Sequence, residues 1–138
     1  MSSRLDTVHR VARLREAGAR AAVAVAQRAH AQAAQEHAGH LAALGASTVT
    51  AGTSGHVQAG FAGVERHADT VAAAGTLVLE REQDRQAALS GWVLATRHER
   101  LLGQVCERHR SEAAEHAERR TQRLLDDLAG RRDSEGAP

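Results

Sequence analysis

The chain has 138 residues, a formal net charge of +1 at pH 7, one Phe, one Trp, one Cys and no Tyr. Its length suits one domain rather than two, and a near-neutral charge argues against a protein that holds nucleic acid by counterion release. Alanine dominates the apolar residues and removes little apolar area from water when buried. We therefore expect long helices lying side by side, not a compact globule.

The sequence predicts a cytoplasmic protein. The single Cys106 cannot form a disulfide within the chain, which suits a reducing compartment. Charged residues occupy the N-terminal positions where a signal peptide would need an apolar run. The longest uncharged apolar stretch, residues 71–79, is far shorter than the ~20 residues that span a bilayer.

The first predicted element is a helix from about residue 5 to about residue 44. Apolar or small residues recur there at steps of three and four, the signature of a helix with one narrow buried face. Most of the stripe, with a weak gap near His37, comprises Leu5, Val8, Val11, Leu14, Gly18, Ala22, Val25, Ala29, Ala33, Leu41 and Leu44.

A turn is predicted at residues 45–55, where the sequence reads GASTVTAGTSG. Glycines clustered with Ser and Thr are typical of turns and helix caps. Ser54 is expected to cap the helix that follows, because its hydroxyl can accept a hydrogen bond from an unpaired backbone N–H.

A second helix is predicted from about residue 56 to about residue 132. Its apolar positions alternate by four and three, as in a coiled-coil heptad: Val57, Phe61, Val64, Ala68, Val71, Gly75 and Val78. Polar residues at 81–86 interrupt the stripe, and Leu89, Trp92, Leu102 and Val105 are expected to resume it with a small phase shift.

The two predicted helices differ in length. If the hairpin closes at 45–55, the first helix ends its pairing near residue 97, and the last ~35 residues of the second must project, bend or meet another protein. Residues 107–123 are mostly charged and precede Leu124, Leu125 and Leu128. The predicted fold is all-α: one domain, residues 1–138, forming a long antiparallel two-helix coiled-coil hairpin with a longer second helix.

The sequence predicts no catalytic, cofactor-binding or metal-binding residues. A di-iron bundle needs Glu-x-x-His on two helices, and no glutamate here has a histidine three residues later. The histidines are interpreted as solvated surface residues. The sequence also lacks a Gly-x-Ser-x-Gly nucleophile motif and, having no lysine, a phosphate-binding P-loop.

The candidate partner-binding residues form three groups. Trp92 either fills the seam where the first helix ends or anchors a partner, since Trp is enriched among residues that dominate binding energy. Leu41, Leu44, Phe61 and Val64 flank the turn, where they either pack the tip or face a partner. Arg119, Arg120, Arg123, Asp126 and Asp127 form a charged end that is either a solvated face or docks inside a larger ring or groove.

Two terminal segments resemble a known family. The N-terminal RLDTVHRVARLREAGARAA and the C-terminal ERRTQRLLDDLAGRR resemble the opening and closing helices of the FliJ family, the soluble stalk of the flagellar type III export apparatus. The length, the hairpin position and the short first helix are also similar. The glycine- and alanine-rich middle departs from the more leucine-rich members.

The resemblance implies a non-catalytic coupling protein of flagellum biogenesis and motility. Family members insert their terminal coiled coil into the hexameric export ATPase, contact the membrane export-gate protein near the hairpin tip, and escort export chaperones. By position, the group from Arg119 to Asp127 would face the ATPase, and Leu41, Leu44, Phe61 and Val64 would face the gate. Such a protein is cytoplasmic and peripheral at the cell membrane.

Two other hypotheses remain open. One is a generic coiled-coil scaffold or homodimer, whose heptads would bury against a second copy. The other is a metal-binding helical bundle, which metal analysis of the purified protein would test.

Overall fold

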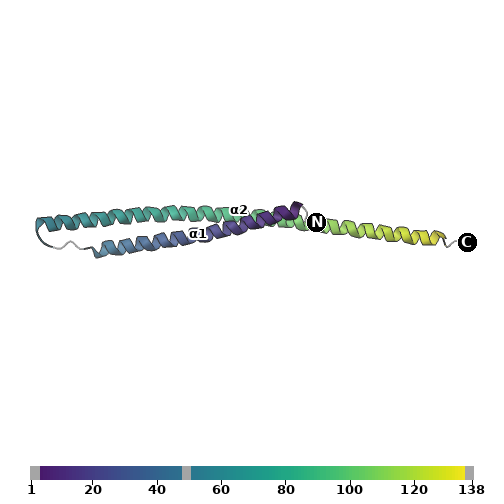
Figure 1. Ribbon diagram of the computed structural model, residues 1–138, viewed down its shortest axis with the longest axis horizontal. Helices are drawn as coiled ribbons and strands as arrows, with labels where there is room; N and C mark the ends of the chain where they lie inside the picture. The colour runs from purple at the N-terminus through teal and green to yellow at the C-terminus, as the bar shows by residue number, and fades with distance from the viewer. Residues whose placement is uncertain (1–3, 48–50, 136–138) are drawn as a thin grey trace. The chain divides into compact units, whose positions relative to one another are not determined.

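The computed structural model describes residues 4–47 and 51–135, with side chains described through residue 129. Two α-helices, α1 (Arg4–Ala46) and α2 (Ser54–Glu135), pack against each other as a helical hairpin (Figure 1). No strand occurs in these described residues. The predicted all-α hairpin with a longer second helix is confirmed, and each described boundary lies within about three residues of its predicted position.

Both helix ends at the turn are capped by residues beside the glycines. The backbone N–H of Ser47 donates to the Leu44 carbonyl at 3.1 Å, and its hydroxyl donates to the Ala43 carbonyl at 2.9 Å. The Val57 N–H donates to the Thr53 carbonyl at 3.1 Å, so Thr53 rather than Ser54 is the N-cap of α2. Residues 48–50 of the predicted turn lie outside the described residues.

The contacts divide the chain into two compact units, which we describe separately. The tip unit is residues 15–95 and contains the turn. The arm unit is residues 1–14 together with residues 96–138. In both units a segment of α1 contacts a segment of α2 that runs antiparallel to it, so that residue numbers rise along one helix as they fall along the other.

In the tip unit, the α2 side of the seam continues through its polar residues without a phase shift. Glu82 and Arg85 are half-buried and continue the four-and-three steps from Val78 to Leu89. The predicted interruption at 81–86 is therefore wrong. A carboxylate and a guanidinium occupy the heptad positions there, where they bind each other and a residue of α1.

The α1 side of the seam differs from the predicted stripe. Leu14 and Val25 are 67% and 60% exposed, and Val8, Val11 and Leu41 are exposed as well. The half-buried or buried positions instead follow two seven-residue series: His9, Glu16, Val23, His30 and His37, and Leu5, Ala12, Ala19, Ala26 and Ala33. Small alanines let the helices approach, and the polar residues between them find partners across the seam.

The turn is asymmetric, so each residue of α1 pairs with a residue of α2 further from the turn than a symmetric hairpin would give. The Ser47 hydroxyl lies 2.8 Å from Nδ1 of His67, so the end of α1 lies beside a residue more than three turns into α2. In the arm unit, Asp6 near the start of α1 contacts Arg110 at 3.0 Å. The predicted end of pairing near residue 97 is therefore wrong, because it assumed a symmetric turn.

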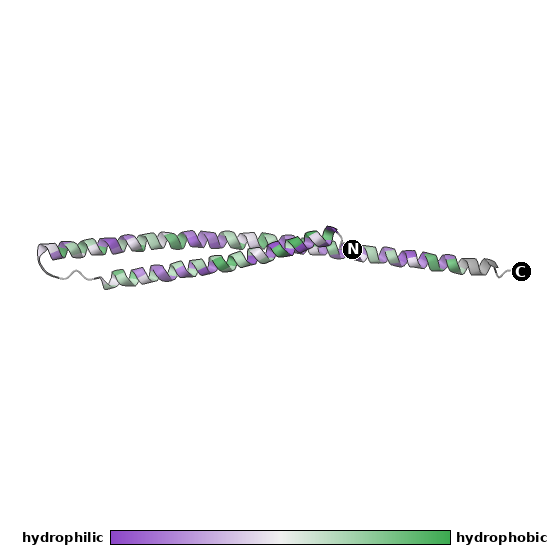
Figure 2. Ribbon diagram, in the orientation of Figure 1, coloured by the Kyte–Doolittle hydropathy of each residue, from purple (hydrophilic) through white to green (hydrophobic). Residues whose placement is uncertain are grey.

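The buried core is thin. Among the described residues, Ala12, Val23, Ala33 and Cys106 are buried. Hydrophobic and hydrophilic residues are mixed along both helices (Figure 2). No described helical stretch is long and apolar enough to cross a membrane. Stability therefore depends on seam contacts more than on a wide apolar interior.

Candidate partner-binding surfaces

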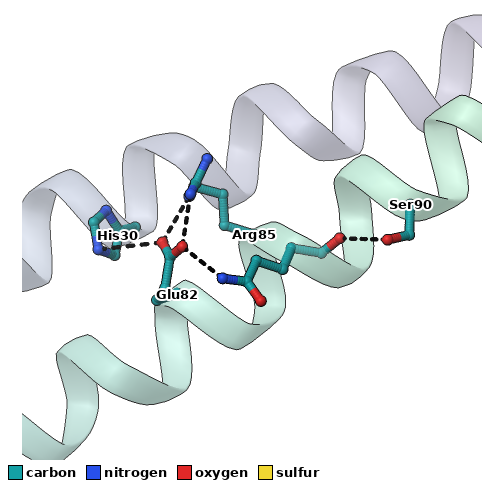
Figure 3. Close-up of polar contacts among 5 residues, drawn as sticks. His30, Glu82, Arg85 and Ser90 are labelled. Atoms are coloured by element: carbon teal, nitrogen blue, oxygen red, sulfur yellow. Dashed lines mark hydrogen bonds and ion pairs between the residues drawn. The ribbon is translucent and has the colours of Figure 1, made fainter.

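The seam of the tip unit contains a polar cluster centred on Glu82 (Figure 3). Arg85 donates to both Glu82 carboxylate oxygens, at 2.7 and 2.6 Å, and the Gln86 amide donates at 3.0 Å. From α1, Nε2 of His30 lies 3.6 Å from Glu82 Oε2. The hydrogen bonds from Arg85 and then Gln86 lower the pKa of Glu82 to about 2, and the bond to Glu82 raises the pKa of Arg85.

This cluster is suited to alignment of the helices rather than to chemistry. Both Glu82 oxygens already accept hydrogen bonds from Arg85. In the described part of the chain, no group of three or more His, Cys, Asp or Glu side chains is placed to hold a metal ion. Polar residues at heptad positions fix the register of a coiled coil at some cost in stability. We therefore infer that this cluster fixes the register of α1 against α2.

Trp92 lies on the same seam. Its indole N–H donates to Glu16 Oε1 at 2.7 Å, and the ring is half-buried. Trp92 was predicted to fill the seam at the N-terminal end of the first helix. Its partner Glu16 instead lies twelve residues after the first residue of α1. A partner that used the indole N–H of Trp92 would have to replace this hydrogen bond.

Three histidines that the sequence predicted to be solvated surface residues belong to the seam. His9 Nε2 lies 3.0 Å from a Glu99 oxygen in the arm unit. His30 contacts Glu82, and His37 lies against Gly75, whose added Cβ would come 3.4 Å from Nε2. The seven-residue spacing from His9 to Glu16 and from His30 to His37 was the available signal.

The predicted tip residues do not form one cluster. Phe61 is 58% exposed and Leu41 is exposed, whereas Leu44 and Val64 are half-buried. Because α1 ends beside His67, Phe61 belongs to a stretch of α2 that extends past the end of α1 (Figure 1). The exposed aromatic ring is therefore available from α2 alone.

The predicted charged residues lie on an exposed helical segment. We call residues 111–129 the arm; each of them is exposed. Arg119 pairs with Glu115 at 2.8 Å, and Gln122 donates to Asp126 at 2.9 Å. Arg120, Arg123 and Asp127 are exposed on the same segment.

The arm also carries a heptad stripe that sequence reasoning missed. Its members step by three and four residues: Ala114, Ala117, Thr121, Leu124 and Leu128. Such a stripe lies on one face of a helix. The stripe is hard to recognise in the sequence because its first members are small and charged residues outnumber them. The arm is thus amphipathic and presents an uncovered apolar face.

No protein-family model, curated protein or solved structure matches this chain. The resemblance to the FliJ family consequently rests on the terminal sequence segments and on the length and order of the two helices.

Proposed function

We propose that the chain is a non-catalytic stalk of the flagellar type III protein export apparatus. In this proposal the arm binds the hexameric export ATPase and the tip contacts the membrane export-gate protein. The chain also escorts export chaperones. Its place of action is the cytoplasmic face of the cell membrane.

The observation that carries the proposal is the exposed, amphipathic arm. A helix gains most of its stability in proteins from packing an apolar face, and the stripe from Ala114 to Leu128 is exposed in this chain. A partner groove or ring that covers Leu124 and Leu128 would supply the missing packing. Arg119, Arg120 and Arg123 beside Asp126 and Asp127 offer charged groups of both signs for its rim.

The tip supports a second contact. Phe61 presents an exposed aromatic ring, and aromatic residues are enriched among interface residues that dominate binding energy. Contacts at the arm and at the tip would let one chain join two partners. This is what coupling requires.

The alternative is a homodimeric coiled-coil scaffold. Exposed aliphatic residues of the tip unit, Val25 and Leu79, support it because a second copy could cover them. Light-scattering mass separates the two proposals: a stalk is a monomer when free, and the scaffold is a stable dimer.

The test is the rate of ATP hydrolysis by the cognate export ATPase. The full chain should raise this rate by promoting ring assembly, and a chain truncated after Arg110 should not. The cut follows Arg110 because its guanidinium contacts Asp6 in the hairpin. Circular dichroism checks that the truncated hairpin is folded, and unchanged stimulation by it would contradict the proposal.

A further inference from the structure

The arm unit has a second uncovered surface, distinct from the arm. Its seam is marked by the 3.0 Å contact of His9 with Glu99, by Cys106 Sγ at 3.6 Å from the Leu5 carbonyl, and by the buried Ala12. Beside this seam lies what we call the valine patch: Val8, Val11, Leu102 and Val105. Its three valines are 42–49% exposed, and Leu102 is half-buried.

The four patch residues lie on one side of the helix pair. Each directly precedes a seam residue: Val8 precedes His9, Val11 precedes Ala12, Leu102 precedes Gly103, and Val105 precedes Cys106. In two antiparallel helices of the same hand, the residues that precede seam positions turn to the same side.

The tip unit shows the same geometry directly. There a shallow hollow is lined by Ala29 and Gln32 of α1 together with Leu77 and Arg81 of α2. All four precede seam residues. Residues of this class from the two helices therefore share one side of the pair.

The two sides of the arm unit differ in chemistry. Residues that follow seam positions are polar, among them Arg10, Arg13, Arg100 and Gln104. The side with the valine patch is apolar in the middle, with Arg4, His98 and His109 at neighbouring positions that are all exposed. Two leucines outside the patch, Leu14 and Leu101, are also exposed in this unit. An apolar patch bordered by polar residues is typical of a protein-binding surface.

Charge selects the kind of partner. Residues 4–14 and 96–110 contain seven arginines and three carboxylates, a formal net charge of +4. The three carboxylates already have basic neighbours: Asp6 and Glu107 contact Arg110, and Glu99 contacts His9. On the patch side itself lie Arg4, His98 and His109 and none of these three carboxylates, so this side favours negatively charged groups over positively charged ones.

We propose that the valine patch binds an acidic amphipathic helix of a partner protein. An aliphatic ridge of that helix would lie between α1 and α2, and its acidic flanks would face Arg4, His98 and His109. Half-exposed valines beside a seam suit a helix ridge better than a membrane, because interfacial membrane helices insert Trp, Phe and Leu. This binding is independent of the arm.

The test uses the full chain and a designed helical peptide of about 20 residues. Its leucines are spaced by three and four, and glutamates flank them; a matched peptide has lysines in their place. By fluorescence anisotropy, the glutamate peptide should bind at least about ten-fold more tightly than the lysine peptide. Equal affinities would overturn the proposal.

Two variants separate the patch from the general charge of the unit. Val105→Glu and Gln104→Glu add the same charge at adjacent positions, but only the first lies in the patch. The first should weaken peptide binding at least about ten-fold and the second about two-fold or less, with circular dichroism showing both folded. Equal weakening would overturn the proposal.

Further measurements would reveal two other possible occupants of the valine patch. A dimer that Val105→Glu converts to a monomer would assign the patch to a second copy, and binding to anionic phosphatidylglycerol vesicles without peptide binding would assign it to a membrane. Either result would overturn the proposal.

Discussion

The indole N–H of Trp92 donates to Glu16 at 2.7 Å, joining α2 to α1 across 76 positions of the sequence. Because Trp92 is the chain's single tryptophan, its fluorescence reports directly on this part of the seam. The pair aligns the two helices in a seam that buries little apolar area.

Replacing Glu16 by alanine should lower the free energy of unfolding by about 1 kcal/mol. A hydrogen bond to a charged group contributes more than a neutral one, but water can replace part of it at a half-buried indole. The measurement is urea unfolding followed by Trp92 fluorescence. Glu36→Ala is the control, because Glu36 is exposed and accepts a bond from Gln32 within α1; equal losses in the two variants would contradict the assigned role of Glu16.

The Glu82 cluster predicts a specific dependence of stability on pH. The pKa of Glu82 is lowered to about 2, below its ordinary value near 4.3. Its stabilising contribution is thus fully present above that ordinary value and is lost as the pH falls toward about 2.

The difference in melting temperature between the native chain and Glu82→Gln should accordingly be constant above about pH 5 and shrink between about pH 4.5 and 2. Melting followed by circular dichroism measures it. Glu80→Gln, an exposed neighbour, should show no such narrowing. A Glu82→Gln difference that stays constant to pH 2 would show that Arg85 and Gln86 do not hold the carboxylate in its charged form.

Two glycines of α2 should respond differently to alanine. An added Cβ at Gly91 meets nothing within 4 Å, whereas at Gly103 it would lie 3.4 Å from His9 Nε2, the atom that contacts Glu99. Gly91→Ala should raise the free energy of unfolding by about 0.5–1 kcal/mol through helix propensity. Gly103→Ala should gain less, because its methyl group would lie in van der Waals contact with His9 Nε2 and restrict the room in which His9 meets Glu99. Urea unfolding compares them, and an equal or larger gain at Gly103 would be evidence against a close seam there.

The sequence was sufficient to predict the helices and the turn. Clustered glycines beside Ser and Thr located the turn, and apolar residues at steps of three and four predicted both helices. The heptad from Val57 to Val78 was also placed correctly at Val71, Gly75 and Val78, which are half-buried in the tip unit.

The α1 seam could not be read from hydrophobicity alone. Val25 and Leu14 are more apolar than Ala26 and Glu16, yet the latter pair is half-buried. A polar residue is tolerated at a seam when a partner lies opposite, and Glu16 has Trp92 while His30 has Glu82. Those partners are about 50 to 76 residues away in sequence, so their pairing depends on the turn geometry.

Of the candidate site, the sequence located residues but not their grouping. It placed Arg119 to Asp127 on a projecting segment, and each of them is exposed. It grouped Phe61 with Leu41, although the contact between Ser47 and His67 shows that α1 ends well before it reaches Phe61. The stripe ending at Leu124 and Leu128 was hidden by its small members, Ala114 and Ala117.

The most direct test of the proposed stalk is amide hydrogen exchange, with and without the export ATPase. Free in solution, residues 111–129 should exchange quickly, because a helix whose apolar face is exposed opens readily. Bound to the ATPase, they should exchange at least about ten-fold more slowly, whereas residues 15–40 should be unchanged. Unaltered exchange in the arm under saturating ATPase would contradict the account.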